Sequence, residues 1–366
     1  MPTHRPRVAV ACQGGGSHTA FSAGALKRLL AADQYEFVAF SGTSGGAIDA
    51  LLAWYGLVAG EGPRTGERLE AFWEAMAATA PADYLFNQWA IAAHRALSPV
   101  VAPEVSPYLY PTWARDQLRA AVEHHVDFAG IPQLVRGAGP SMPLLLVGAV
   151  DVLSGRFKVF RNAWEGQPVL EVTADAVLAS AAIPTLFRAA RVTGPDGQER
   201  LYWDGLFSQN PPVRDLPDAQ PDQIWVLQIN PTERRAEPTE MGDIRDRRNE
   251  LAGNLSLRQE LHFIEKINKI VRGRRAPSVE LVEVDAEGVE TRRTYREITV
   301  FRIELDEADL GLELDTESKL NRDPAFIRRL FAGGERHADR FLAALAAGGE
   351  AADRYRWRDR SPAGVR

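Results

Sequence analysis

The chain has 366 residues, of which 45% are hydrophobic and 25% charged, the usual mix of a globular protein that buries a core. Its formal net charge of −6, from 43 basic and 49 acidic residues, argues against nucleic acid as a partner. The single cysteine, Cys12, excludes an internal disulfide framework and a cysteine-rich zinc site. No stretch approaches the roughly 20 apolar residues that span a bilayer, and the first apolar run is too short for a signal peptide. We therefore expect a cytoplasmic protein.

Two strand–loop–helix units open the chain. The β-branched, apolar run at 7–12 predicts a buried strand, and the spacing of large apolar residues over 20–32 predicts a helix. The same order returns with a strand at 36–40, the glycine-rich segment SGTSGG at 41–46 and a helix at 47–57. Strand, glycine loop and helix, twice in succession, indicate a parallel α/β sheet.

The rest of the chain continues this sheet after a helical, aromatic stretch. Residues 61–140 are expected to form a helical insertion that packs against the sheet, and about 243–275 a charged helical segment. The other expected elements are a hairpin over 143–160, a helix at 173–183, strands at 188–193 and 200–205 joined by the turn PDGQ, strands at 224–231 and 297–305, and a closing helix at 323–347. We expect a single domain over 1–350 and a disordered tail over 351–366.

The segment SGTSGG places a hydroxyl between glycines where a strand passes into a helix. Gly42-Thr43-Ser44-Gly45-Gly46 fits the pattern G-x-S-x-G, in which a sharp strand-to-helix turn exposes a nucleophilic serine. Small neighbours permit strained backbone torsions, and the N-terminus of the following helix favours developing negative charge. The alternative is a glycine-rich helix start capped by Ser44.

A nucleophilic serine also needs an oxyanion hole, which the first glycine loop can supply. Gly14, Gly15 and Gly16 directly follow the first strand, and their N–H groups are not shielded by side chains. In a parallel sheet this loop and SGTSGG lie at the same carboxyl edge. The alternative is a dinucleotide-binding loop, but Thr19 replaces the third glycine of G-x-G-x-x-G and Glu36 precedes the second strand instead of ending it.

A base is the remaining requirement, and the sequence offers histidines and an aspartate. His262 lies in a charged helix and His337 in the closing helix, so neither falls at the end of a strand. The better candidate is Asp204 in LYWDGLFSQNPP (201–212), where an acid followed by Gly205 ends a strand-like run and enters an irregular loop. An ordinary Asp-Gly turn is the alternative at this position.

Together these segments resemble the patatin-like phospholipases. The resemblance rests on GGG at 14–16, GTSGG at 42–46, and DG at 204–205 followed by N-P at 210–211. The segments ADAVLASAAIPTLFRAARV, HHVDFAGIPQL, NLSLRQELHFIEKIN and AGGERHADRFL extend it over nearly the whole chain. It implies a three-layer α/β/α fold with a mainly parallel central sheet.

The resemblance also implies a Ser-Asp catalytic dyad without histidine. Ser44 would attack an acyl ester carbonyl, Asp204 would act as base, and Gly14, Gly15 and Gly16 would form the oxyanion hole. The supporting residues that it implies are Gly42, Gly45, Gly46, Gly205 and Asn210. Asn210 would brace the loop that follows Asp204, from here on the aspartate loop. No metal or cofactor is expected, and the sequence contains no D-x-D-x-D-G calcium loop.

Three positions depart from the family pattern. His18 stands where the family commonly has a basic residue, Thr19 where it has glycine, and Leu206 where Gly or Ala usually follows DG. None of them is a proposed nucleophile, base or oxyanion-hole glycine. We therefore expect these changes to affect substrate preference and rate more than mechanism.

The expected partner is a lipid or acyl-ester substrate, with transient contact to a membrane surface. Aromatic residues of the insertion either line an acyl channel or form the insertion's own core: Phe72, Trp73, Tyr84, Phe86, Trp89, Tyr108, Tyr110 and Trp113. KINKIVRGRR (266–275) is the most basic stretch, although a solvated helix face is its simplest interpretation. Two other functions stay open: an esterase acting on non-phospholipid esters, and a non-catalytic lipid-binding protein of the same fold.

Overall fold

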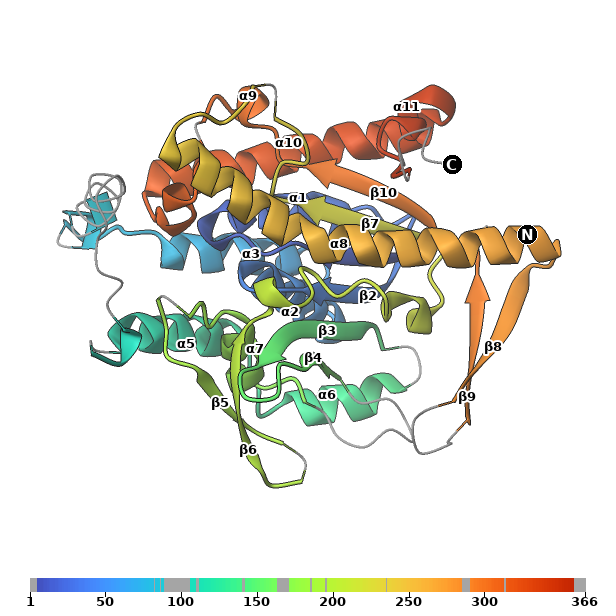
Figure 1. Cartoon of the computed structure of the whole chain (residues 1–366), viewed down its shortest axis with the longest axis horizontal. Coiled ribbons are helices and arrows are strands. Elements are labelled where there is room, and N and C mark those ends of the chain that lie inside the picture. Colours follow the sequence, from blue (N-terminus) through green and yellow to red (C-terminus); the bar gives the residue numbers. More distant parts are fainter. Residues whose placement is uncertain are drawn as a thin grey trace.

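A computed structural model describes residues 5–358, except 82, 86, 89–105, 110–111, 140–141, 163–170, 185, 195, 235, 285–289 and 313. In these residues an eight-stranded sheet carries helices on both faces, and a two-stranded hairpin projects from one end (Figure 1). The predicted three-layer α/β/α fold with a mainly parallel sheet is confirmed.

The sheet places the two glycine loops on neighbouring strands. Its parallel part runs in the order β10 (Thr299–Glu304), β7 (Gln223–Gln228), β1 (Arg7–Cys12), β2 (Glu36–Gly42) and β3 (Leu144–Asp151). The antiparallel pairs are β3 with β4 (Phe157–Arg161), β3 with β6 (Glu199–Asp204), and β6 with β5 (Ala190–Thr193). The central strands are apolar without interruption because both of their faces are covered.

Side chains of β1 alternate between the two cores of the protein. Val8 and Val10 face a core formed with α1 (Ala20–Leu30), α2 (Gly45–Val58), α3 (Arg64–Met76) and α10 (Pro324–Ala347). Ala9 and Ala11 face the other core, which α8 (Met241–Arg274) covers with Leu257, Leu261 and Ile264. This period of two is the pleat of a fully buried strand, with α8 as its outer layer on that side (Figure 1).

The region expected to be an insertion contributes helices to the first core. α3 lies against α1 and α2, and its residues Phe72 and Trp73 are buried there. The indole nitrogen of Trp73 donates to Asp49 Oδ1 at 2.9 Å, which ties α3 to α2. The remaining helices are α5 (Trp113–His125), α6 (Ile131–Ala138), α7 (Ala174–Ser180), α9 (Glu307–Leu310) and α11 (Gly349–Asp353), with short 3-10 helices η1 (Gly16–Thr19), η2 (Pro107–Leu109), η4 (Gly205–Phe207), η5 (Leu216–Ala219) and η6 (Glu317–Leu320).

Two parts of the chain differ from the sequence expectations. A hairpin of β8 (Ser278–Val284) and β9 (Glu290–Arg296) follows α8, although neither strand is predicted. The expected disorder from 351 onward does not hold for residues 351–358, because α11 continues to Asp353 and Arg356 bridges to Phe301 of β10. Tyr355 also packs edge-on against Phe341, which anchors this segment; residues 359–366 lie outside the described part.

One edge of β3 brings together the ends of two distant strands. β2 pairs with the first half of β3 up to Gly42 opposite Val147, and β6 pairs with the second half from Asp204 opposite Ala149. Because β6 runs antiparallel to β2, their carboxyl ends meet head to head beside Gly148. The segments that follow Gly42 and Asp204 must therefore lie side by side.

Asp49 gives a test of the first core. It is fully buried in α2, its Oδ2 has no partner in the described chain, and burial raises its pKa well above the ordinary value. A carboxyl with a raised folded pKa stabilises the protein at low pH, and this contribution is lost as the pH rises toward the folded pKa. We expect Asp49→Asn, which keeps the acceptor for Trp73, to melt about 2–4 °C higher than the wild type at pH 8, with a smaller difference at pH 5.

The control is Asp33→Asn, since Asp33 is exposed in the turn after α1. Thermal melts of the three proteins between pH 5 and pH 8 measure the effect. A difference in melting temperature between Asp49→Asn and the wild type that does not widen with pH would contradict a raised pKa of Asp49.

Candidate active site

Ser44 occupies a strained turn between β2 and α2. Its φ of 57° and ψ of −131° are a conformation that residues other than glycine rarely adopt. The neighbouring glycines make the turn possible: a Cβ on Gly42 would lie 2.2 Å from the Gly46 carbonyl oxygen, and one on Gly46 2.4 Å from the Cys12 carbonyl oxygen. The turn thus presses against the end of β1. The Ser44 side chain stands at the start of α2, where the helix dipole favours negative charge.

Ser180 fixes the backbone of this turn. The Ser44 N–H donates to Ser180 Oγ at 3.0 Å, and that hydroxyl donates to the Gly148 carbonyl at 2.6 Å. Ser180 is completely buried at the end of α7 and was not among the residues expected from the sequence. Its only sequence signal is its place in VLASAAIP, where nothing marks it as a partner of a residue 136 positions earlier.

Asp204 lies against the same turn as the last residue of β6. Its Oδ1 accepts the Leu206 N–H at 2.8 Å, and its side chain is only 1% exposed. Oδ2 has no partner within hydrogen-bond geometry in the described chain. Burial raises the pKa of Asp204 to about 7, against the smaller lowering effects of the Leu206 N–H and the nearby Ser44 hydroxyl. The structure therefore brings Ser44 and Asp204 together, with one carboxylate oxygen free to take a proton.

Gly14 places the first glycine loop directly against Ser44. A Cβ on Gly14 would lie 2.9 Å from the Ser44 Cβ and 2.5 Å from the Thr43 carbonyl oxygen. The Gly14 N–H donates to Asn210 Oδ1 at 2.7 Å, which ties the glycine loop to the aspartate loop. The N–H groups of Gly15 and Gly16 donate to no other residue in the described chain. These two N–H groups therefore remain available as hydrogen-bond donors next to Ser44.

Two of the three positions that depart from the family pattern, His18 and Thr19, have side-chain hydrogen-bond partners. His18 is buried, and its Nε2 lies 2.8 Å from Ser318 Oγ in η6; burial, and then the charge of Lys319, lower its pKa well below the ordinary value. Thr19 Oγ1 donates to the Gly16 carbonyl at 2.8 Å and contacts Gly45, where a Cβ would approach it to 2.3 Å. No histidine in the described residues hydrogen-bonds to Ser44 or Asp204.

The glycine loop is braced from α8 by buried amides. Gln13, immediately before the loop, donates from Nε2 to Asn254 Oδ1 at 2.9 Å and to the Gly253 carbonyl at 3.2 Å. Its Oε1 accepts the N–H groups of Ile229 and Asn230 at 2.9 and 2.8 Å. The Gln13 side chain is thereby saturated with hydrogen bonds, and the start of the loop is fixed to α8 and the end of β7.

The same helix braces the aspartate loop. The Asn210 N–H donates to Ser256 Oγ at 3.1 Å. Glu260 is buried and accepts from the Gln209 side chain and from the N–H groups of Val213 and Arg214. These braces were missed from the sequence because they join a helix to loops that are 46 to 241 residues away along the chain. α8 thus holds both loops that converge on Ser44.

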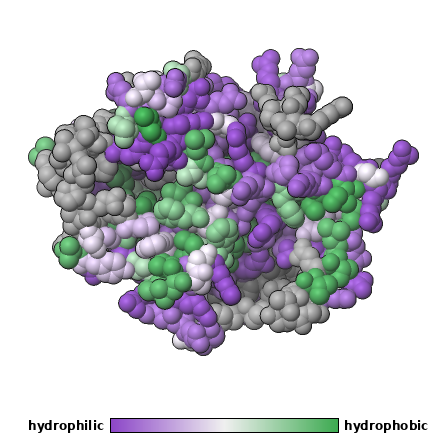
Figure 2. All heavy atoms as spheres, in the orientation of Figure 1, coloured by the Kyte–Doolittle hydropathy of each residue, from purple (hydrophilic) through white to green (hydrophobic). Residues whose placement is uncertain are grey.

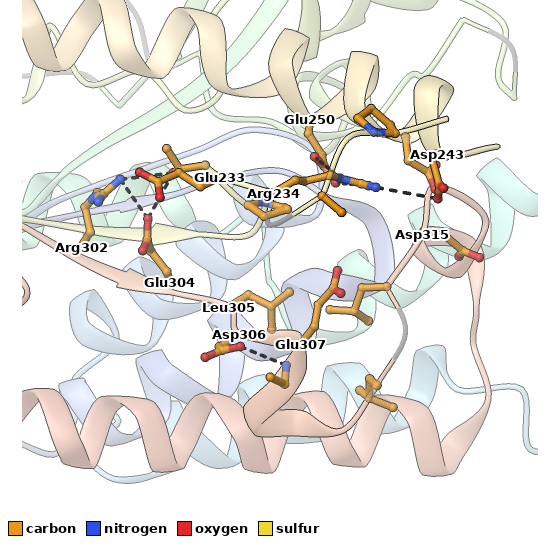
Figure 3. Close-up of a pocket in the computed structure, with 18 of the residues that line it drawn as sticks. Glu233, Arg234, Asp243, Glu250, Arg302, Glu304, Leu305, Asp306, Glu307 and Asp315 are labelled. Atoms are coloured by element: carbon orange, nitrogen blue, oxygen red, sulfur yellow. Dashed lines mark hydrogen bonds and ion pairs between the residues drawn. The ribbon is translucent and has the colours of Figure 1, made fainter. Parts of the chain in front are cut away.

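A large charged cavity opens beside this site at the carboxyl ends of β7 and β10. It has a volume of about 2110 Å³, and its lining includes neither Ser44 nor Asp204. Figure 3 shows acidic and basic side chains pointing into it, with Arg234 paired to Glu250 at 2.7 Å and Arg302 to Glu304 at 2.9 Å. Such a lining does not suit an acyl chain, which needs apolar walls. Within the described residues, no group of three or more His, Cys, Asp or Glu side chains is arranged to hold a metal ion.

The aromatic residues of the insertion divide into two groups. Phe72 and Trp73 belong to the core, whereas Tyr84, Tyr108 and Trp113 are exposed. Phe86, Trp89 and Tyr110 lie outside the described residues. In the part of the chain that the structure describes, no helix is both long and apolar enough to cross a membrane.

Asn254 tests the brace on the glycine loop. Asn254→Ala would leave the buried Gln13 amide without its Oδ1 acceptor, which should lower the free energy of unfolding by about 1–3 kcal/mol in urea titrations. The matched control is Asn249→Ala on the same helix, whose half-buried amide donates to Thr316 Oγ1 at 3.1 Å. Its loss should be smaller, and equal losses for the two variants would argue against a special role of Asn254.

Comparisons with known proteins give the chain a family. A sequence model described as patatin-like phospholipase matches residues 10–217, more than half of the chain. Among curated proteins there is no match. The solved structures most like this one include human GIVD cytosolic phospholipase A2 (10% identity, TM-score 0.47, 96% of this chain and 63% of that one) and VipD from Legionella pneumophila (11%, 0.36, 91% and 67%).

The heterodimeric ExoU–SpcU complex from the type III secretion system of Pseudomonas aeruginosa is a further match, with 18% identity, a TM-score of 0.27 and coverage of 96% of this chain and 66% of that one. The chain thus spans about two thirds of the length of these structures, and with TM-scores below 0.5 the likeness is too loose to carry functional detail. The match to the family over 10–217 rests on the sequence itself and supports hydrolysis of lipid esters in general. The chain belongs to the patatin-like phospholipase family.

Proposed function

We propose that the protein is a serine acyl hydrolase that cleaves acyl ester bonds of lipids, phospholipids among them, with Ser44 as nucleophile and Asp204 as base. The observation that carries the proposal is the buried Asp204 carboxyl beside the strained Ser44, with its pKa raised to about 7 and one oxygen unpartnered. A carboxylate of ordinary pKa is a weak base toward a hydroxyl at neutral pH. Raising its pKa makes it a better proton acceptor while it is still partly ionised.

The reaction then proceeds through an acyl-enzyme. Ser44 Oγ attacks the ester carbonyl as its proton passes to Asp204 Oδ2, and the N–H groups of Gly15 and Gly16 stabilise the oxyanion. The intermediate collapses when the leaving alcohol takes the proton from Asp204. Water then attacks the acyl-enzyme as its proton passes to Asp204, and the fatty acid leaves when Ser44 Oγ takes that proton back from Asp204. No step uses a histidine, a metal or a cofactor.

The glycines and Asn210 have structural parts in this proposal. Gly42, Gly45 and Gly46 permit the turn at Ser44, while Gly205, where a Cβ would lie 2.5 Å from the Gly148 carbonyl oxygen, lets the aspartate loop close against β3. Asn210 occupies the Gly14 N–H and so sets the orientation of the glycine loop. The N–H of Gly14 already donates to Asn210, so Gly14 contributes through its lack of a side chain, which allows the close approach to Ser44.

Two other functions give different outcomes in simple assays. An esterase for non-phospholipid esters would prefer short soluble esters and release no fatty acid from phospholipid vesicles. A non-catalytic lipid-binding protein would not react with a serine-directed phosphonate. The pairing of Ser44 with Asp204 favours an enzyme over the second alternative.

Covalent labelling tests the nucleophile. A fluorophosphonate probe should label the wild type, while Ser44→Ala should show no labelling and at least about a 10³-fold loss of ester hydrolysis, because its nucleophile is gone. Labelling should persist in Ser17→Ala, which removes a buried hydroxyl from η1 near the glycine loop. Equal labelling of wild type and Ser44→Ala would place the nucleophile elsewhere.

The pH dependence tests the base. Because Asp204 must be ionised to accept a proton, kcat/KM on a soluble ester should rise with pH and reach half of its plateau near pH 7. Asp204→Asn should lose this activity yet melt no lower than the wild type at pH 8, since a buried carboxyl with a raised pKa costs stability once it ionises. A midpoint near pH 4, or full activity in Asp204→Asn, would exclude Asp204 as the base.

A further inference from the structure

From Arg248 onward, the outward side of α8 carries cations and large apolar residues but no exposed acids. From position 248 to the end of the helix and its C-cap, the exposed residues are Arg248, Leu251, Ala252, Leu255, Arg258, Gln259, Lys266, Lys269, Ile270, Arg272, Gly273, Arg274 and Arg275. Seven of these thirteen are cationic. This surface, from here on the α8 outer face, belongs to a chain whose net charge is −6.

The acids of the same stretch are held away from the outer face. Glu250 and Glu260 are buried, the first paired with Arg234 and Arg247 and the second hydrogen-bonded to the aspartate loop. Glu265 is half-buried and accepts from Arg272 at 3.0 Å. Helical periodicity therefore separates the charges, since acids point inward and cations outward.

The α8 outer face is continuous with the proposed active site and with the hairpin. η4, which begins directly after Asp204, contacts α8 and carries Phe207, whose side chain is 58% exposed. Beyond the other end of the helix, Val282 and Val284 of β8 are 48% and 62% exposed. Figure 2 looks onto this side of the molecule and shows hydrophobic residues near its middle and over the hairpin, with hydrophilic residues along α8 between them.

We propose that the α8 outer face docks the protein onto an anionic lipid surface, with η4 and the hairpin at its two ends. This proposal rests on the proposed function, because it says that the lipid substrate is encountered as part of a lipid surface. A helix of 34 residues is about 50 Å long and can lie flat in the headgroup layer. Its cations are attracted to anionic headgroups, and the leucines and Phe207 enter the acyl boundary.

Lipid fits this surface better than nucleic acid does. Binding to phosphates of DNA or RNA needs cations but gains nothing from exposed leucines, which at 50% and 60% exposure for Leu251 and Leu255 would stay in water. An anionic bilayer binds both cationic and apolar residues of the same face favourably. Docking there would also bring η4, which directly follows Asp204, to the surface that holds the esters.

Vesicle binding tests the proposal independently of catalysis. Ser44→Ala, as the full chain, should co-sediment with vesicles of phosphatidylcholine and 30% phosphatidylglycerol at least about 10-fold more strongly than with pure phosphatidylcholine. Adding Lys266→Glu and Lys269→Glu should weaken binding to the anionic vesicles by about 10-fold or more. Adding Leu251→Ser and Leu255→Ser instead should also weaken it.

The matched control has the same change of charge elsewhere. Arg191→Glu with Arg200→Glu alters one exposed and one half-buried arginine of β5 and β6 and should leave vesicle binding unchanged. Equal loss in both pairs would mean that net charge alone governs binding and would overturn the proposal. Absence of binding to anionic vesicles would overturn it as well, and so would equal or tighter binding of an RNA oligonucleotide that the same two lysines control.

Activity assays separate this proposal from the proposed function. In the background with Ser44 present, Lys266→Glu/Lys269→Glu should hydrolyse a short soluble ester at the wild-type rate but release fatty acid from anionic vesicles about 10-fold more slowly. Equal rates on vesicles would overturn docking by α8. If neither protein hydrolyses the soluble ester, the proposed function fails, while vesicle binding still decides the docking surface.

Discussion

The structure depends on one constraint: two strands from distant parts of the chain end at the same point on β3. β2 and β6 approach Gly148 from opposite directions along one edge, and the residues that follow each of them have to share the space beside it. A Cβ on Gly148 would come within 2.9 Å of Thr43 Oγ1 and 3.0 Å of the Gln209 carbonyl oxygen. Thr43 itself donates to that carbonyl at 2.6 Å. The closeness of Ser44 and Asp204 follows from strand pairing before any side chain is considered.

This arrangement destabilises the folded protein, and the destabilising features lie at the proposed site. Ser44 has an unfavourable backbone conformation, and buried polar atoms of the aspartate loop lack partners in the described chain: Asp204 Oδ2, Gln209 Oε1 and Asn210 Nδ2. Each such feature is worth on the order of 1–3 kcal/mol. The saturated hydrogen bonds of Gln13, Asn254 and Glu260 lie immediately around these atoms. We interpret them as the compensation that keeps a strained site in one conformation.

The parts of this site that were predictable from the sequence are the local ones. SGTSGG and GGG can be recognised because clusters of glycine between a strand and a helix are unusual. The apolar runs that precede them predict their position in a parallel sheet. Asp204 could be found only with the other two segments, since Asp-Gly is common in turns. The central sheet and its helices could be predicted for the same reason, from periodicity within short windows.

What could not be predicted is set by contacts between distant residues. Gly148 is one glycine within PLLLVGAVDV, and its importance arises only when two other strands pair beside it. Ser180 and Gln13 are ordinary polar residues until their partners are known. The hairpin of β8 and β9 was missed because β9 (ETRRTYR) is almost entirely polar and β8 (SVELVEV) is interrupted by two glutamates. The hairpin projects from the body, so neither strand has the long apolar run of a buried strand (Figure 1).

α8 shows how one helix can serve two surfaces. It lies beyond residues 10–217, which carry the match to the family, yet it holds both loops of the proposed site in place. Asn254, Leu257 and Leu261 follow one another at intervals of three and four, so they face the sheet. Leu251, Leu255 and Arg258 follow one another at intervals of four and three, and they face outward. Because the two sets share no side chain, residues of the outer face can be adapted to a binding partner without disturbing the geometry around Ser44.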